Sequence, residues 1–295
     1  MSRVLKLKNS RLMLVSDIQG HQKDFDQVIK VYQQLKKQDK VDYLVFCGDL
    51  MHGYPGYEDK SDELYIQIRF LQKKDPSIIF LLGNHELAHI MHWELTKGDI
   101  NFTHDLEVKI KPQRVSFSNY LSRLPFAIIT DNGLLINHTG PSIYLSNIRD
   151  SDLFENIKAQ DWYDNLDFQK EYLIEGDLLE KWKPNYGASL MQKPSAKVLW
   201  ETFMNKNEYE YEDIYESILD GFLNTMSKIK DCHLLISSHI SEGKGFKIVN
   251  DKQFRLCTSH GAKSDADKKY LLVNTQVSYV NALSLESCLY NLWES

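Results

Sequence analysis

Short apolar runs alternate with amphipathic stretches through the first third of the chain. Residues 12–15, 43–47 and 78–82 are apolar runs of strand length, as expected for strands covered on both faces. Between the first two, apolar residues recur every three or four positions from Phe25 to Leu35, which predicts a helix. A second helix is predicted around residues 61–73. This order predicts successive β-α units whose strands end at one edge of one sheet.

The rest of the chain mixes strands with a long helical region. Residues 126–130 and 134–137 predict a hairpin turned by Asp131-Asn132-Gly133, and a second hairpin is predicted from residues 246–249 and 254–258. Further strands are predicted at 233–236 and 271–273. Residues 97–113 are polar and are interpreted as an excursion or lid. We expect one domain over residues 1–295, with a helical insertion around 147–230.

Polar groups follow five of the predicted strands directly. Each has an ordinary explanation alone, as a helix cap or a packed histidine. Together they offer carboxylate, amide and imidazole donors, a mixture that suits manganese, iron or zinc. A carboxylate that bridges, most plausibly Asp49, would hold two ions about 3.5–4 Å apart. The five residues are Asp17, Asp49, Asn84, His138 and His239.

Residues 85–89 also fit the H-E-x-x-H pattern of zinc proteases. That pattern needs His85 and His89 on one face of an established helix, with Glu86 as general base. Here His85 comes two residues after a strand and a glycine, so it belongs to a turn or a helix start. The protease is therefore the minor alternative.

Composition narrows the range of functions. The chain has 295 residues, 42% of them hydrophobic, which is enough for a sizeable core. Its formal charge is −6 and it has no long basic tract, so nucleic-acid binding is not indicated. Residues 1–10 lack the apolar core of a signal peptide, and no apolar run approaches the roughly 20 residues that span a bilayer. We expect a cytoplasmic protein without a membrane partner.

The order of the polar motifs resembles that of the calcineurin-like metallophosphoesterases. The motifs are Asp-Ile-x-Gly at 17–20, Gly-Asp at 48–49, Gly-Asn-His-Glu at 83–86, His-x-Gly at 138–140 and Ser-His at 238–239. Within that superfamily the chain is most similar to the serine/threonine phosphoprotein phosphatase branch. The resemblance implies an α/β fold in which a two-sheet β-sandwich is flanked by helices.

The resemblance also implies roles for these residues. Asp17 and Asp49 would bind the first metal ion, with Asp49 bridging. The second ion would be bound by Asn84, His138 and His239. His85 would protonate the leaving oxygen while a metal-bridging hydroxide attacks phosphorus. The implied activity is that of a phosphomonoesterase acting on a phosphoprotein or a small phosphate ester.

Two departures from the branch leave alternatives open. Gln19 stands where the branch has a metal-binding histidine, and it could ligate the first ion less tightly. His52 and Gly53 replace the acid that orients the catalytic histidine and an arginine that grips the phosphate. His52 and His260 are candidate substrate contacts. The alternatives are a nucleotide hydrolase of the diadenosine polyphosphate type and a degenerate member that binds partners without turnover.

Overall fold

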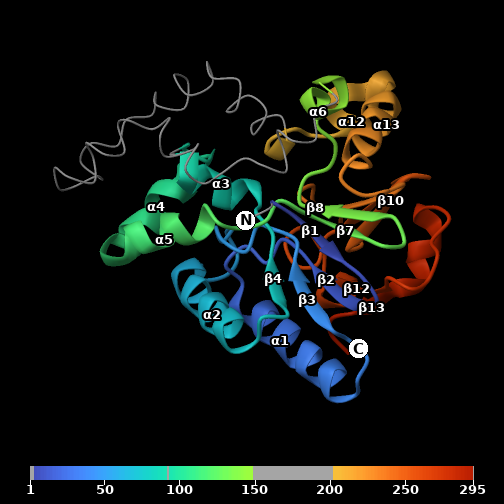
Figure 1. Ribbon diagram of the computed structural model, residues 1–295. Coiled ribbons are helices and arrows are strands. Elements are labelled where there is room, and N and C mark those ends of the chain that lie inside the picture. Colours follow the sequence, from blue (N-terminus) through green and yellow to red (C-terminus); the bar gives the residue numbers. More distant parts are fainter. Residues whose placement is uncertain (1–2, 92, 149–201, 295) are drawn as a thin grey trace.

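Two β-sheets pack face to face at the centre of the computed structural model, which describes residues 3–91, 93–148 and 202–294 (Figure 1). The five-stranded sheet has the order β13 (Leu289–Asn291), β12 (Lys269–Asn274), β2 (Arg11–Val15), β3 (Tyr43–Phe46) and β4 (Ile78–Phe80). The six-stranded sheet has the order β1 (Val4–Leu7), β7 (Ala127–Thr130), β8 (Leu134–Asn137), β9 (Leu234–Ser237), β11 (Gln253–Leu256) and β10 (Phe246–Asn250). The predicted two-sheet α/β fold is confirmed.

Alternation along the strands divides the core in two. Leu12 and Leu14 of β2 belong to the apolar cluster between the sheets, together with Ile136 of β8 and Ile236 of β9. Their neighbours Met13 and Val15 point the other way and join the cluster beneath the helices. Because successive side chains of a strand face opposite sides, one apolar run can supply both layers. This explains why residues 12–15 are apolar throughout.

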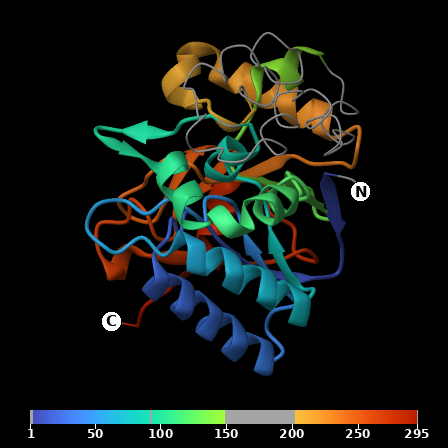
Figure 2. The ribbon, with the colours of Figure 1, turned by 90° about the vertical axis from the view of Figure 1, so that its left-hand side faces the viewer.

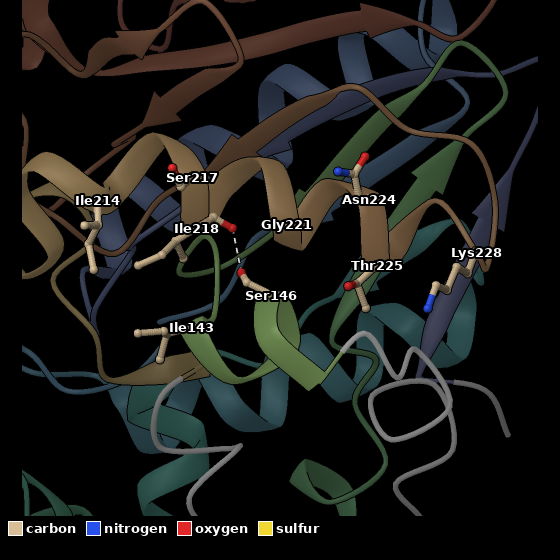
Figure 3. Close-up of a pocket in the computed structure, with 9 residues that line it drawn as sticks. All are labelled: Ile143, Ser146, Ile214, Ser217, Ile218, Gly221, Asn224, Thr225 and Lys228. Carbon is tan, nitrogen blue, oxygen red and sulfur yellow. Dashed lines mark hydrogen bonds between the residues drawn. The ribbon is translucent and has the colours of Figure 1, made fainter.

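Helices cover the outer face of each sheet (Figure 2). α1 (Gln22–Lys37) and α2 (Ser61–Lys74) lie on the five-stranded sheet, where Phe25, Tyr32 and Tyr65 are buried. α6 (Ile143–Ile148), α12 (Glu208–Tyr211) and α13 (Tyr215–Met226) belong to the other side of the sandwich. Ser146 Oγ of α6 donates a hydrogen bond of 2.6 Å to the carbonyl of Ile218 in α13 (Figure 3). The described part also contains short 3₁₀ helices at Lys111–Gln113, Glu212–Ile214, Asp265–Asp267 and Ala282–Cys288.

The segment interpreted as a polar excursion is folded and packed. After α3 (Asn84–Met91), the short strands β5 (Thr96–Lys97) and β6 (Ile100–Asn101) form a small antiparallel pair. They are followed by α4 (Phe102–Lys109) and α5 (Arg114–Leu121). Phe102, Leu106 and Phe117 are buried. The excursion interpretation is therefore corrected: this segment is part of the helical layer.

Both predicted hairpins are confirmed, whereas two strands of the sheets were not predicted. The hairpin β7/β8 and the hairpin β10/β11 form as expected, and Gly133 turns the first with a positive φ of 82°. The edge strands β1 and β13 were not predicted. The single domain with a helical insertion stays a prediction, because residues 149–201 lie outside the described part. Among the described helices, none is long and apolar enough to cross a membrane.

Candidate active site

The two sheets deliver the predicted polar residues to a common place. β2, β3 and β4 are parallel neighbours, and Asp17, Asp49 and Asn84 lie just past their carboxyl ends. β8 and β9 are parallel neighbours in the other sheet, and His138 and His239 follow their ends. Open α/β sheets bind ligands beyond the carboxyl ends of their strands. The site thus lies where the same ends of both sheets meet.

Four of the five side chains form a tight cluster. His138 Nε2 lies 3.2 Å from Asp49 Oδ2, and the Asn84 amide lies 2.9 Å from both His138 Nε2 and His239 Nδ1. With its nitrogen inward, this amide also donates to Asp49 Oδ2 at 3.0 Å; with its oxygen inward, it presents a ligand atom. Ligand atoms of Asp49, His138 and His239 all lie within 4.8 Å of one another. These three residues are a candidate metal-binding cluster.

Asp17 and Gln19 border this cluster and leave buried oxygen atoms unused. Asp17 Oδ2 and Gln19 Oε1 have no hydrogen-bond partner within the described part of the chain. Burial raises the pKa of Asp17 to about 7. The neighbouring His138 lowers this pKa, whereas the Asp49 carboxylate raises it further. A buried oxygen without a donor is costly. The residues therefore fit a divalent cation, which carboxylate and amide oxygens can coordinate.

A backbone carbonyl orients the His138 ring, and the surroundings set the charge of both His138 and His239. His138 Nδ1 donates to the Cys47 carbonyl at 2.8 Å, which leaves Nε2 facing Asp49. Burial opposes the charge of His138, but the Asp49 carboxylate outweighs it and raises the pKa of His138 to about 9. Burial and the neighbouring His138 lower the pKa of His239 to about 3, so its ring is neutral. The Asp49 carboxylate therefore favours positive charge at this point, whether on the His138 ring or on a cation.

Backbone strain is concentrated at the site. Non-glycine residues with positive φ include Asp17, Gln19, Asp49, His52 and His239, with φ values between 46° and 72°. Such conformations cost of order 1–3 kcal/mol each and persist where the surrounding structure enforces them. Gly48 also has a positive φ of 97°, and a Cβ on it would lie 2.5 Å from the His138 ring. The strained backbone of these loops lowers the stability of the fold but directs the side chains into the site.

Glu86 holds one of those loops in place. Its carboxylate accepts hydrogen bonds from the backbone N–H groups of Gly83, Asp49, Leu50 and Met51, at 2.9–3.3 Å. Its oxygens are thus committed to the loop after β3, so Glu86 is placed as a brace and not as the general base of a protease. This geometry does not support the H-E-x-x-H alternative.

His85 lies beside the cluster without completing it. Its backbone N–H donates to Asp49 Oδ1 at 3.1 Å, and its Nε2 lies 3.7 Å from Asp49 Oδ2. Burial lowers the pKa of His85 despite the nearby Asp49 carboxylate. Its Nδ1 faces away from the cluster and lies 3.1 Å from His52 Nδ1.

His52 does not occupy the place expected of a substrate contact. Its side chain is buried behind His85, and its second nitrogen, Nε2, lies 2.7 Å from His89 Nε2. Both ring nitrogens are therefore engaged by other histidines. The sequence offered no sign of this arrangement, because the partners come from different elements.

His260 lies at the edge of the site in a stack that the sequence analysis missed. Its ring stacks on Tyr54 with centroids 3.9 Å apart, and its backbone N–H donates to the Asp17 backbone carbonyl at 2.8 Å. Lys97 Nζ lies 4.4 Å from the Tyr54 ring centroid, a cation–π contact. Burial, with His85 and Lys97 nearby, lowers the pKa of His260 to about 4.

A separate pocket between α6 and α13 is not the chemical site. Figure 3 shows that its lining comes from these two helices and the turn before α13, with Ile143, Ser146 and Ile218 among its residues. Among the described residues, its lining includes Lys228 but neither a carboxylate nor an imidazole. These residues do not offer the groups needed for acid–base or metal chemistry.

Comparisons with known proteins agree with this geometry. The family model of the calcineurin-like phosphoesterases matches residues 10–240. A cold-active protein-tyrosine phosphatase from the psychrophile Shewanella sp. has a similar structure, with a TM-score of 0.55 and 16% identity over 93% of this chain and 78% of that one. A serine/threonine phosphatase from Saccharomyces cerevisiae gives a TM-score of 0.50 and 15% identity over 92% and 77%. No functionally curated protein matches the sequence significantly. The chain belongs to the calcineurin-like phosphoesterases and is a hydrolase of phosphoric esters.

Proposed function

We propose that the chain is a two-metal phosphomonoesterase of the serine/threonine protein phosphatase type. The observation that carries the proposal is the largely buried cluster of Asp49, Asn84, His138 and His239. It lies beside oxygens of Asp17 and Gln19 that have no hydrogen-bond partner among the described residues. Asp17, Gln19 and Asp49 would hold one ion, and Asp49, Asn84, His138 and His239 the other. This donor set suits manganese, iron or zinc. Divalent ions in such a site supply charge for phosphate oxygens and make water more acidic.

His85 is proposed as the general acid. Its Nε2 lies on the cluster side of the ring, close to Asp49, whereas Nδ1 is occupied by His52. A proton on Nε2 can therefore pass to the oxygen of a leaving group that sits over the cluster. General acid help of this kind contributes about 10²–10⁴ in rate.

Lys97 and His260 are proposed to bind the substrate. Gly53 stands where the branch has a phosphate-gripping arginine, so a cation must come from elsewhere. Lys97 is largely exposed and is held near the site by Tyr54, which also stacks on His260. An ammonium offers a point charge rather than a bidentate fork. We therefore expect weaker phosphate binding than an arginine would give.

The substrate class is proposed from the site and from the two similar structures. Both are named as protein phosphatases, so a phosphorylated side chain is the first substrate to test. Their identity to this chain is low, and the similarity concerns the fold. A small phosphate monoester would meet the same groups, because the cluster recognises the phosphate itself.

A substrate panel tests the proposal. The protein is freed of metal, loaded with Mn²⁺, Fe²⁺ or Zn²⁺, and given an aryl phosphate, an aryl diester, diadenosine tetraphosphate, and phosphoserine and phosphotyrosine peptides. We expect metal-dependent release of phosphate from the monoesters. Faster cleavage of the dinucleotide would instead favour the nucleotide hydrolase. Binding of metals with no turnover of any substrate would favour the non-catalytic alternative.

A matched pair of variants keeps this test specific. Asn84→Ala removes a proposed ligand and should abolish metal-dependent turnover. Gln253→Ala removes another buried amide, whose partners are Ser237 and Tyr215, and should retain it. Equal activity of both variants would contradict the proposed ligand set.

A further inference from the structure

A buried chain of polar side chains leads away from His85 into the helical layer. His85 Nδ1 lies 3.1 Å from His52 Nδ1, His52 Nε2 lies 2.7 Å from His89 Nε2, and His89 Nδ1 lies 3.1 Å from Glu107 Oε1. Arg114 closes the chain through an ion pair with the Glu107 carboxylate. The five residues come from the loop after β3 and from α3, α4 and α5. The chain thus joins the site to the segment that the sequence analysis took for a lid.

The residues of this polar series are buried and packed against aromatic rings. His52 and His89 are each 1% exposed and Glu107 is 2% exposed. The Phe102 ring stacks on His52 at 5.8 Å, and the Phe117 ring meets His89 edge-on at 4.9 Å. Little water can reach these contacts, so each ring nitrogen needs a hydrogen-bond partner among the neighbouring side chains. Low polarity also strengthens each hydrogen bond.

Counting protons fixes the direction of the chain. Each contact between two nitrogens needs one proton, and a neutral imidazole carries one proton on one of its two nitrogens. Arg114 keeps Glu107 a carboxylate, which only accepts, so His89 carries its proton on Nδ1. His89 Nε2 then accepts from His52 Nε2, and His52 Nδ1 accepts from His85 Nδ1. The reverse order would need either a protonated Glu107 beside Arg114 or a second proton on the buried His89 ring.

We propose that Glu107 is a positioning residue that sets the tautomer of His85 through His89 and His52. In this arrangement Nδ1 of His85 keeps its proton. Nε2 is the nitrogen that takes up a second proton from water and then passes it to the leaving oxygen, which returns the ring to its neutral Nδ1–H form. His52 serves as the acceptor behind His85, at the position where the resembling branch has an acid. The inference rests on the proposed function for the role of His85, but the tautomer order itself does not.

The direct test reads the tautomers in the wild-type protein. Long-range ¹H–¹⁵N spectra of ring-labelled histidine distinguish a proton on Nδ1 from one on Nε2. We expect Nδ1–H for His85 and His89 and Nε2–H for His52. The opposite pattern, or rapid averaging at all three rings, would overturn the proposal. This measurement needs no variant to fold and no substrate.

Variants of Glu107 then show whether it positions the proton of His85 or only stabilises the fold. Glu107→Gln can offer its amide nitrogen to His89, so the tautomer pattern should reverse or become mixed. Its kcat on alkyl phosphates should fall by at least about tenfold and by no more than the roughly 10²–10⁴ that general acid help is worth, with a smaller loss on aryl phosphates and little change in KM. Equal losses on both substrates, or an unchanged tautomer pattern, would contradict the positioning role.

Two further variants complete the comparison. Arg114→Lys keeps a cation beside Glu107 and should retain the wild-type tautomer pattern. Glu208→Gln makes the same chemical change beside another buried arginine, Arg255, without a histidine contact. It should lower thermal stability but leave the tautomers and the leaving-group dependence unchanged. A dead enzyme with the expected tautomers would count against the proposed function alone.

Discussion

The two sides of Asp49 differ in how completely their polar groups are satisfied. On one side, Asp17 and Gln19 each bury an oxygen that has no partner in the described part of the chain, and both have strained backbones. On the other, His85, His52, His89 and Glu107 form an unbroken series of contacts. A cation would stabilise the first arrangement, whereas the second is satisfied by its own contacts. The difference separates the residues proposed to bind metal from those proposed to orient His85.

The largest effect is expected from Asp49, which both sides share. Asp49→Asn removes the negative charge that faces His138 and His85, so bound metal and phosphatase activity should fall below detection. Elemental analysis and the aryl phosphate assay measure both. Asp42→Asn is the control, because Asp42 precedes the same strand and pairs with Arg11. Retention of full metal content in Asp49→Asn would contradict the shared role.

His85→Ala tests whether His85 protonates the leaving group. The variant should keep its metals but lose about 10²–10⁴ in rate on alkyl phosphates, the range of general acid catalysis. An activated aryl phosphate needs little protonation, so its rate should fall much less. His104→Ala removes an exposed histidine and should change neither rate. If metal is lost with the ring, His85 is a ligand instead.

Gln19→His tests whether residue 19 contacts the ion proposed to lie beside Asp17. An imidazole there should bind the first ion more tightly than a neutral amide, on the order of tenfold if the gain is about 1.4 kcal/mol. Titration with Mn²⁺ should show the weaker of two sites strengthened. Gln22→His, at the start of α1, should leave both sites unchanged. An unaltered titration in Gln19→His would show that residue 19 does not face an ion.

The smallest effect is expected at the edge of the site. Lys97→Ala should raise KM by up to about fivefold, since an exposed charge pair is worth roughly 0–1 kcal/mol. The effect should shrink at high salt, because exposed charges are screened. Lys109→Ala removes another exposed lysine, which pairs with Asp59, and is the control. A loss of kcat alone in Lys97→Ala would show a role other than substrate binding.

The sequence predicted those features that local pattern determines. The runs that end at Asp17, Asp49 and Asn84 are strands because their apolar character is continuous, and parallel strands bring their ends together. The cluster could thus be anticipated from three strand ends and two histidines. The convergence of Asp17, Asp49 and Asn84 follows from the topology of β-α units. His138 and His239 join them because the second sheet packs against the first.

The histidine chain could not be anticipated in the same way. His52, His89 and Glu107 meet only because α3 and α4 pack beside the loop after β3. α4 was missed because its buried residues, such as Phe102 and Leu106, are interspersed with His104, Asp105 and Glu107, so the segment looks polar. Glu107 and Arg114 compensate each other inside the fold. A pair of that kind is visible only in three dimensions.

The most direct test of the account is the location of bound metal. Crystals soaked in Mn²⁺ and measured for anomalous scattering should show one peak bounded by Asp49, Asn84, His138 and His239. A second peak, weaker because of Gln19, should lie by Asp17 and Asp49, and His85 should coordinate neither ion. A peak held by His85 and His89 together, or metal bound away from Asp49, would contradict the account.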